Sequence, residues 1–132
     1  MTVESLDHVN IVTADLDRAE RFYRDLLRLD ARPAPPPLTH DTARWMYDTG
    51  GRAVLHLNSL AAPRRFDRPM TPGPTGALHH VALRCVGHDD LLARAEAMGL
   101  ECHRNTVPAA GLRQIFVADP DGVLLELNFF AG

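Results

Sequence analysis

The sequence predicts an α+β fold of two tandem βαβββ modules that form a curved mixed sheet. Three observations predict this fold. Two short segments recur in the same order at nearly the same distance, a helical pattern follows the first segment in each copy, and a stretch rich in proline and glycine separates the copies. The chain has 132 residues, of which 45% are hydrophobic, so we expect a single domain over residues 1–132 with its own core.

The recurring segments are expected to be the first and the last strand of each module. Leu6–Ile11 (LDHVNI) resembles Leu78–Leu83 (LHHVAL), 72 positions later in the chain. Val54–Asn58 (VLHLN) resembles Leu124–Asn128 (LLELN), 70 positions later. Two matches in the same order at nearly equal offsets indicate a duplicated unit more strongly than either match alone.

The two copies and their linker follow from these offsets. Module one spans about residues 1–62, module two spans about residues 76–132, and the linker covers about residues 61–76. The linker contains the punctuating residues Pro63, Pro69, Pro72, Gly73, Pro74 and Gly76. Such a composition interrupts regular structure, so we expect no helix or strand there.

Module one is predicted to run from a strand through a helix to a hairpin. Residues 5–12 alternate in polarity and are rich in β-branched side chains, which predicts a strand. Thr13–Asp17 offers an N-cap for an amphipathic helix to about Leu29. Residues 32–37 are rich in proline and predict a loop or a distorted edge strand. A hairpin is expected from strands at 44–48 and 52–59.

Module two repeats this order with clearer signals. Gly99 is the expected C-cap of its helix, and the Asp-Pro-Asp-Gly sequence at 119–122 is a strong turn signal. The expected elements are a strand at 78–86, a helix at 89–98, and strands at 100–107, 112–118 and 123–130.

Four polar residues occupy repeat-equivalent positions on the expected strands. His8 corresponds to His80, and His56 corresponds to Glu126. If one pseudo-twofold axis relates the modules, equivalent side chains converge on that axis, and three imidazoles with one carboxylate make a metal site. Glu126 lies in an apolar strand, where a carboxylate is costly unless it is paired or coordinated.

Other histidines are alternatives to these ligands. A single histidine on a strand is more often a hydrogen-bonded structural residue than a ligand, so the repeat pairing carries the prediction. His79 competes with His80, but the repeat alignment favours His80 and places His79 towards the helix. His40, His88 and His103 have no repeat partner, so we expect them to be ordinary surface residues.

Candidate pocket residues lie on the strands next to the expected ligands. Trp45 and Tyr47 precede His56, while Arg113 and Gln114 precede Glu126. Either member of each pair is a candidate to face the site. Core packing is an equally good interpretation for Trp45, and a solvated edge position for Arg113.

These motifs resemble the vicinal oxygen chelate superfamily, which includes glyoxalases, methylmalonyl-CoA epimerases, extradiol dioxygenases and the bleomycin and fosfomycin resistance proteins. The resemblance rests on LDHVNI at residues 6–11, DLDRAERFYRDLL at 15–27, LHHVAL at 78–83 and FVADPDGVLLEL at 116–127. It implies the glyoxalase/dioxygenase-like fold, a homodimer, and a divalent ion bound by His8, His80 and Glu126. The fourth family position corresponds to His56, where glyoxalases and epimerases usually carry Glu or Gln.

The resemblance implies an enzyme, and we expect a metal-dependent lyase or isomerase that binds a small oxygenated substrate through two oxygens. Glu126 or His56 is the expected catalytic base, and the ion is Zn, Ni, Mn or Fe, which imidazole ligands do not distinguish. The alternatives are an Fe(II) extradiol-type dioxygenase with His56 as acid–base residue, and a non-enzymatic protein that sequesters an antibiotic.

Composition excludes several other classes of function. The net charge of −3 gives no electrostatic basis for binding nucleic acid. No stretch approaches the roughly 20 apolar residues of a membrane-spanning helix. The two cysteines have no CxxC spacing, and the N-terminus has no export signal, so we expect a cytoplasmic protein that acts on a small molecule.

Overall fold

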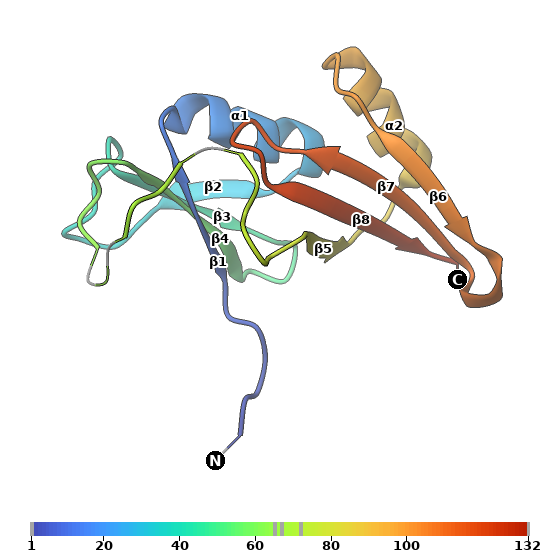
Figure 1. Ribbon diagram of the computed structural model, residues 1–132, viewed down its shortest axis with the longest axis horizontal. Coiled ribbons are helices and arrows are strands. Elements are labelled where there is room, and N and C mark those ends of the chain that lie inside the picture. The colour runs from blue at the N-terminus through green and yellow to red at the C-terminus, as the bar shows by residue number, and fades with distance from the viewer. Residues whose placement is uncertain (1, 65, 67, 72, 132) are drawn as a thin grey trace. The chain divides into compact units, whose positions relative to one another are not determined.

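The computed structural model describes residues 2–64, 66, 68–71 and 73–131, and it divides into two compact units, Met1–Thr71 and Pro72–Gly132. The boundary between the units falls inside the predicted linker, of which Arg65, Asp67 and Pro72 lie outside the described residues. Within the described residues, each unit contains a four-stranded sheet and an α-helix (Figure 1).

The first unit has the strand order β1-β4-β3-β2. β1 runs parallel to β4, and the other pairs are antiparallel. The edge position of β2 suits its sequence, because proline cannot donate a hydrogen bond to a neighbouring strand. The elements are β1 (Val9–Thr13), α1 (Leu16–Leu27), β2 (Asp30–Pro33), β3 (Ala43–Tyr47) and β4 (Ala53–Ser59).

The second unit has the equivalent order, β5-β8-β7-β6, again with the first strand parallel to the last. The predicted duplication of a βαβββ module is therefore confirmed. The elements are β5 (Val81–Arg84), α2 (His88–Ala97), β6 (His103–Val107), the short 3-10 helix η1 (Pro108–Ala110), β7 (Leu112–Ala118) and β8 (Leu124–Phe130).

The first strand of each module is shorter than predicted, so two candidate ligands lie just outside the strands. β1 begins at Val9 rather than near residue 5, and β5 begins at Val81 rather than at residue 78. The parallel ladder of β1 with β4 begins at the pair Val9 and Leu55, and that of β5 with β8 begins at the pair Val81 and Leu125. His8 and His80 therefore lie immediately before their strands.

Helix α1 is defined by a cap at each end. The Asp15 carboxylate accepts a hydrogen bond from the Arg18 N–H at 3.0 Å, which satisfies a free donor of the first turn. Arg28 adopts a left-handed conformation with φ of 57°, so the helix ends at Leu27 and not near Leu29. Its buried face consists of Leu16, Ala19, Phe22, Tyr23 and Leu26.

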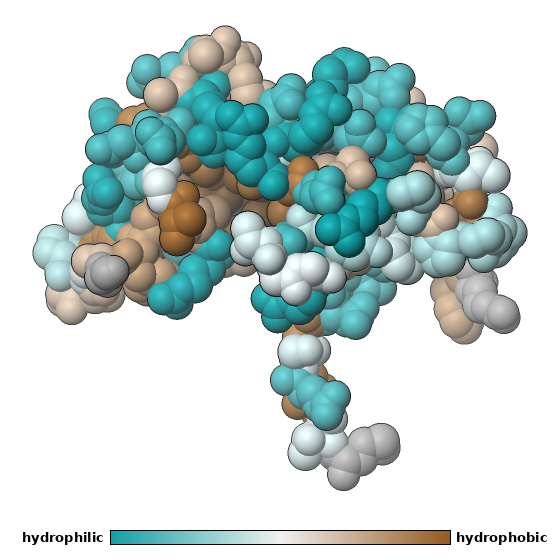
Figure 2. All heavy atoms as spheres, turned by 180° about the vertical axis from the view of Figure 1, so that it is seen from behind, coloured by the Kyte–Doolittle hydropathy of each residue, from teal (hydrophilic) through white to brown (hydrophobic). Residues whose placement is uncertain are grey.

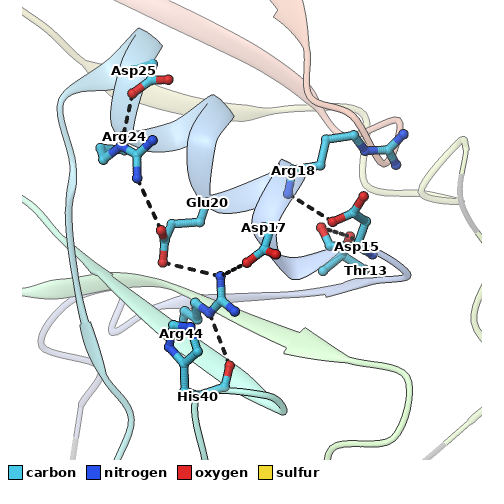
Figure 3. A network of polar contacts seen from close by, with 9 residues as sticks. All are labelled: Thr13, Asp15, Asp17, Arg18, Glu20, Arg24, Asp25, His40 and Arg44. Atoms are coloured by element: carbon cyan, nitrogen blue, oxygen red, sulfur yellow. Dashed lines mark hydrogen bonds and ion pairs between the residues drawn. The ribbon is translucent and has the colours of Figure 1, made fainter.

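A buried arginine joins this helix to the sheet (Figure 3). The Arg44 side chain on β3 is only 8% exposed, and its guanidinium lies 2.6 Å from the Asp17 carboxylate and 3.6 Å from that of Glu20. It also donates to the backbone carbonyl of His40 at 3.1 Å. A buried guanidinium requires such partners, so this network fixes α1 over β3.

The helix of the second unit covers the corresponding side of its sheet. Leu91 and Ala95 of α2 are buried, as are Leu125 and Leu127 of β8. The interpretation of His88 as a surface residue is wrong. Its side chain is 9% exposed and its ring meets Phe129 edge-on at 5.1 Å, because the first turn of α2 packs on the end of β8.

The exposed surface is mainly polar. In Figure 2, hydrophilic side chains cover most of the face in view, with hydrophobic side chains among them. Large hydrophobic residues that are more than nine-tenths exposed include Val3, Phe66 and Val86. Single exposed hydrophobic residues are ordinary in folded proteins. None of the helices in the described ranges has the length and apolar character to cross a membrane.

Candidate functional site: two equivalent half-sites

The register of the two sheets places the four predicted ligands in equivalent positions. In the first unit, the second residue after His8 pairs with His56 across β1 and β4. In the second unit, the second residue after His80 pairs with Glu126 across β5 and β8. Each unit therefore carries one pair of predicted ligands on the sheet face opposite its helix. We call these pairs, His8 with His56 and His80 with Glu126, the two half-sites. Within the described residues, no group of three or more His, Cys, Asp or Glu side chains is close enough together to hold a metal ion.

In the first unit, the His56 ring is stacked between two other rings. The centroid of His8 lies 3.7 Å from it at an interplanar angle of 11°, and that of Trp45 lies 3.9 Å away at 10°. His56 is 9% exposed. Burial, together with the nearby His8, lowers the pKa of His56 to about 4, so the ring is neutral at pH 7.

His8 is oriented by the residue before it. Its Nδ1 atom lies 2.6 Å from Oδ2 of Asp7, and this hydrogen bond holds the pKa of the Asp7 carboxyl below its usual value. A carboxylate only accepts hydrogen bonds, so the Nδ1 atom of His8 carries the proton. The lone pair of His8 is then on Nε2, which is the arrangement that carboxylate–histidine pairs provide for a metal ion.

In the second unit, a histidine nitrogen and a carboxylate oxygen lie close together. Nε2 of His80 is 3.8 Å from Oε1 of Glu126. Two bonds of about 2.1 Å to one ion span at most about 4.2 Å, so both atoms can bind the same ion. His79, which we expected to face the helix, is exposed instead, and its Nδ1 lies 2.9 Å from Nδ1 of His80.

The other oxygen of Glu126 ends a chain of side-chain amides. Asn128 donates to Oε2 of Glu126 at 3.0 Å, and its own oxygen accepts from Gln114 at 3.0 Å. Gln114 in turn accepts from Asn105 at 2.8 Å. The chain crosses β8, β7 and β6 on the sheet face that carries Glu126.

This donor set fits a divalent ion such as Zn, Ni, Mn or Fe, which bind imidazole and carboxylate ligands. His8 and His80 each have Nε2 directed away from their Nδ1 partner, and Glu126 has one oxygen outside the amide chain. His56 is not placed to bind the same ion as His8. The two rings are stacked in nearly parallel planes, so their nitrogen lone pairs do not point at one another's target. His8 and His56 can bind one ion only after one of the two rings turns.

The candidate pocket residues fall on different faces. Trp45 lies against His56, and Tyr47 lies under the guanidinium of Arg32, 4.4 Å from the ring centroid. Gln114 lies on the Glu126 face through the amide chain. Arg113 pairs with Phe129 on the opposite face and reaches Asp89 of α2 at 3.4 Å.

Several polar residues near the half-sites were not predicted. In the first unit, a pocket of about 450 Å³ is lined by residues that include Asn10, Asn58 and Arg64. Asp7 and Asn128 orient predicted ligands. A signal for Asn128 was present in the sequence, because asparagine follows two positions after His56 and after Glu126 in the repeat.

Comparison with known proteins identifies relatives of the whole chain. The family described as the Glyoxalase/Bleomycin resistance protein/Dioxygenase superfamily matches residues 5–127. "Glyoxylase I 4" of Arabidopsis thaliana is 26% identical over 125 residues, which cover 93% of this chain and 69% of that protein. Mitochondrial methylmalonyl-CoA epimerase of Mus musculus is 26% identical over 130 residues, covering 93% and 71%.

A solved structure has the same fold at lower identity. The fosfomycin resistance protein FosX of Listeria monocytogenes, determined as a mutant with Mn(II) and a dihydroxypropylphosphonic acid, superposes with a TM-score of 0.71. It is 15% identical, and the match covers 98% of this chain and 93% of that one. At this identity the likeness establishes the fold alone.

Proposed function

The chain belongs to the Glyoxalase/Bleomycin resistance protein/Dioxygenase superfamily, and on this premise we propose that it is a metal-dependent lyase or isomerase. The substrate is a small molecule with two neighbouring oxygens. Its cofactor is one divalent ion, and the proposed ligands are His8, His56, His80 and Glu126. The observation that carries the proposal is the 3.8 Å approach of His80 Nε2 to Glu126 Oε1 at positions equivalent to the stacked pair His8 and His56.

The relatives support the class of reaction. One curated relative is named a glyoxylase and another an epimerase. The FosX structure contains Mn(II) and a vicinal diol in the same fold. Lyases and isomerases of this kind need a way to stabilise negative charge on substrate oxygens, and a bound divalent ion supplies it as a Lewis acid.

The residues of this chain would bind the ion and transfer the proton of the substrate. Three neutral imidazoles and one carboxylate would leave a divalent ion with a net charge near +1, and an octahedral ion would keep two positions for substrate oxygens. Glu126 or His56 would accept the proton of the substrate. His56 is available for this because it is neutral at pH 7 and because its stacked position allows it to leave the ion without unfolding the strand.

Metal analysis of protein purified without chelators tests the proposal. We expect about one zinc, nickel or manganese per site in the wild type, and its loss in His8→Ala and in Glu126→Ala. His40→Ala is the matched control, because His40 is exposed and is not among the predicted ligands. Glu126→Gln should abolish turnover and retain some metal. A wild type that binds no ion after reconstitution would refute the ligand assignment.

One observation favours a second candidate, an Fe(II) extradiol-type dioxygenase. Because the His56 ring is stacked on the His8 ring, its lone pair does not point to the same position as that of His8. Without His56, the remaining two histidines and one carboxylate are the ligand types of the facial triad in non-haem iron oxygenases. About one iron per site, with ring cleavage of a catechol in the presence of oxygen, would decide for this candidate.

We also propose a homodimer, and mixing variants tests whether one site is shared between subunits. If it is shared, a mixed dimer of His8→Ala and Glu126→Ala chains has one site with both defects and one intact site. Metal binding should then recover to one ion per dimer. If each site lies within one chain, mixing restores nothing. Light scattering on the same samples gives the oligomeric state.

A further inference from the structure

We propose that Asn128 and Gln114 are positioning residues that hold Glu126 as a monodentate ligand, with Oε2 occupied by Asn128 and Oε1 presented to the ion beside His80. This inference rests on the proposed function, because it requires Glu126 to bind a divalent ion.

The direction of the amide chain follows from its end. The Glu126 carboxylate only accepts hydrogen bonds, so Asn128 must present its NH₂ group to it. The Asn128 oxygen then faces Gln114, which must donate in turn, and the Gln114 oxygen accepts from Asn105. Only one assignment of all three amides satisfies every bond. Each donor therefore strengthens the next, and the polarisation ends on Oε2 of Glu126.

Among its described residues, the first module has no such chain of amide hydrogen bonds at the equivalent position. Asn58 is the repeat equivalent of Asn128 and lies two residues after His56. It is 5% exposed, and its amide oxygen has no hydrogen-bond partner. The amide chain is thus not a general consequence of the fold. It is present in the module whose last strand carries a carboxylate.

The geometry also divides the two carboxylate oxygens. Asn128 holds Oε2 at 3.0 Å, while Oε1 is the oxygen that approaches Nε2 of His80. With Oε2 held by Asn128, the carboxylate would bind an ion through Oε1, the oxygen beside His80. One coordination position that a bidentate carboxylate would fill would then remain for the second substrate oxygen.

Metal affinity tests the proposal without any substrate. Mn(II) binding is followed by the loss of the free-ion signal in electron paramagnetic resonance, and Zn(II) binding by competition with a coloured chelator. Removing a hydrogen-bond partner of a ligand typically weakens metal binding by about 10- to 100-fold. We expect losses in this range for Asn128→Leu and for Gln114→Met, which keeps the length of the side chain without its amide. Asn58→Leu, the repeat-equivalent control, should leave both affinities unchanged.

A spectroscopic signature separates positioning from a general loss of structure. In the infrared difference between metal-loaded and metal-free protein, a monodentate carboxylate gives a wider separation of its two stretching bands than a bidentate one. Asn128→Leu should narrow this separation, and Asn58→Leu should not. Wild-type protein that binds neither ion would overturn both the proposed function and this inference. Wild-type binding that Asn128→Leu and Gln114→Met leave intact would overturn the inference alone.

Discussion

Replacing Gly122 by alanine probes the closest backbone approach found at any described glycine. Gly122 ends the Asp-Pro-Asp-Gly turn before β8 and has φ of +87°. A Cβ atom at this position would lie 2.6 Å from Cα of Gly73 and 2.8 Å from its nitrogen. Both neighbours are backbone atoms, so no side chain can move aside. The Gly73 N–H also donates to the carbonyl of Asp121 at 3.0 Å, which ties the two segments together.

The magnitude is a sum of two effects. A left-handed conformation costs alanine about 1–2 kcal/mol, part of which is offset by the smaller entropy of the unfolded chain. Forcing atoms into an occupied space adds about 1–3 kcal/mol. We therefore expect Gly122→Ala to lower the free energy of unfolding by about 2–4 kcal/mol, which corresponds to roughly 8–16 °C in melting temperature at about 4 °C per kcal/mol.

Gly99 provides the matched control. It has φ of +71°, and a Cβ atom there would meet nothing within 4 Å. Gly99→Ala therefore carries the conformational cost alone, about 1 kcal/mol. Urea denaturation followed by circular dichroism measures the free energy of unfolding of both variants. The two values can be compared if the free energy falls with urea concentration at the same slope in both. If Gly122→Ala is no less stable than Gly99→Ala, the contact between Gly122 and Gly73 is not tight and the reasoning fails.

The remaining predictions concern pH. Arg44 holds the pKa of Asp17 below its usual 3.8 through the hydrogen bond of Figure 3, so this interaction stabilises the fold above that pH and is lost as the pH falls through the lowered pKa. Asp17→Asn should therefore melt at a lower temperature than the wild type at pH 7, and the difference should shrink towards pH 3; a constant difference would contradict the assignment. The pKa of His56 in the metal-free protein is about 4, so its imidazole signals in nuclear magnetic resonance should titrate near that pH. Because the unfolded chain takes up this proton near pH 6.5, His56 should also make stability fall between pH 6.5 and 4, and His56→Gln should remove that dependence.

Much of the fold could be read from short-range patterns. The hairpin predicted at 44–48 and 52–59 appears as β3 and β4, and the strand predicted at 112–118 is β7 with those bounds. The prolines of residues 32–37 indicated an edge position, and β2 is the edge strand. These features depend on the conformational limits of single residues and on alternation along one strand, which the sequence carries directly.

Other features depended on partners far away in the chain. The first strand of each module was predicted too long, because alternation along the chain does not show where its ladder with β4 or β8 begins. Arg44 is 27 positions from Asp17, and no local pattern indicates that a strand arginine is buried against a helix carboxylate. Arg113 could not be assigned to a face, because the register of β7 with β8 decides this.

The sequence by itself determined the duplication and the equivalence of His8 with His80 and of His56 with Glu126, because a repeat preserves spacing and strand alternation along the chain. Only the tertiary structure decided how these residues are held. The stack of His56 between His8 and Trp45, and the amide chain that ends on Glu126, arise between neighbouring strands. The physical reason is that cross-strand contacts depend on register and on the rotation of each side chain, and spacing along one strand contains neither.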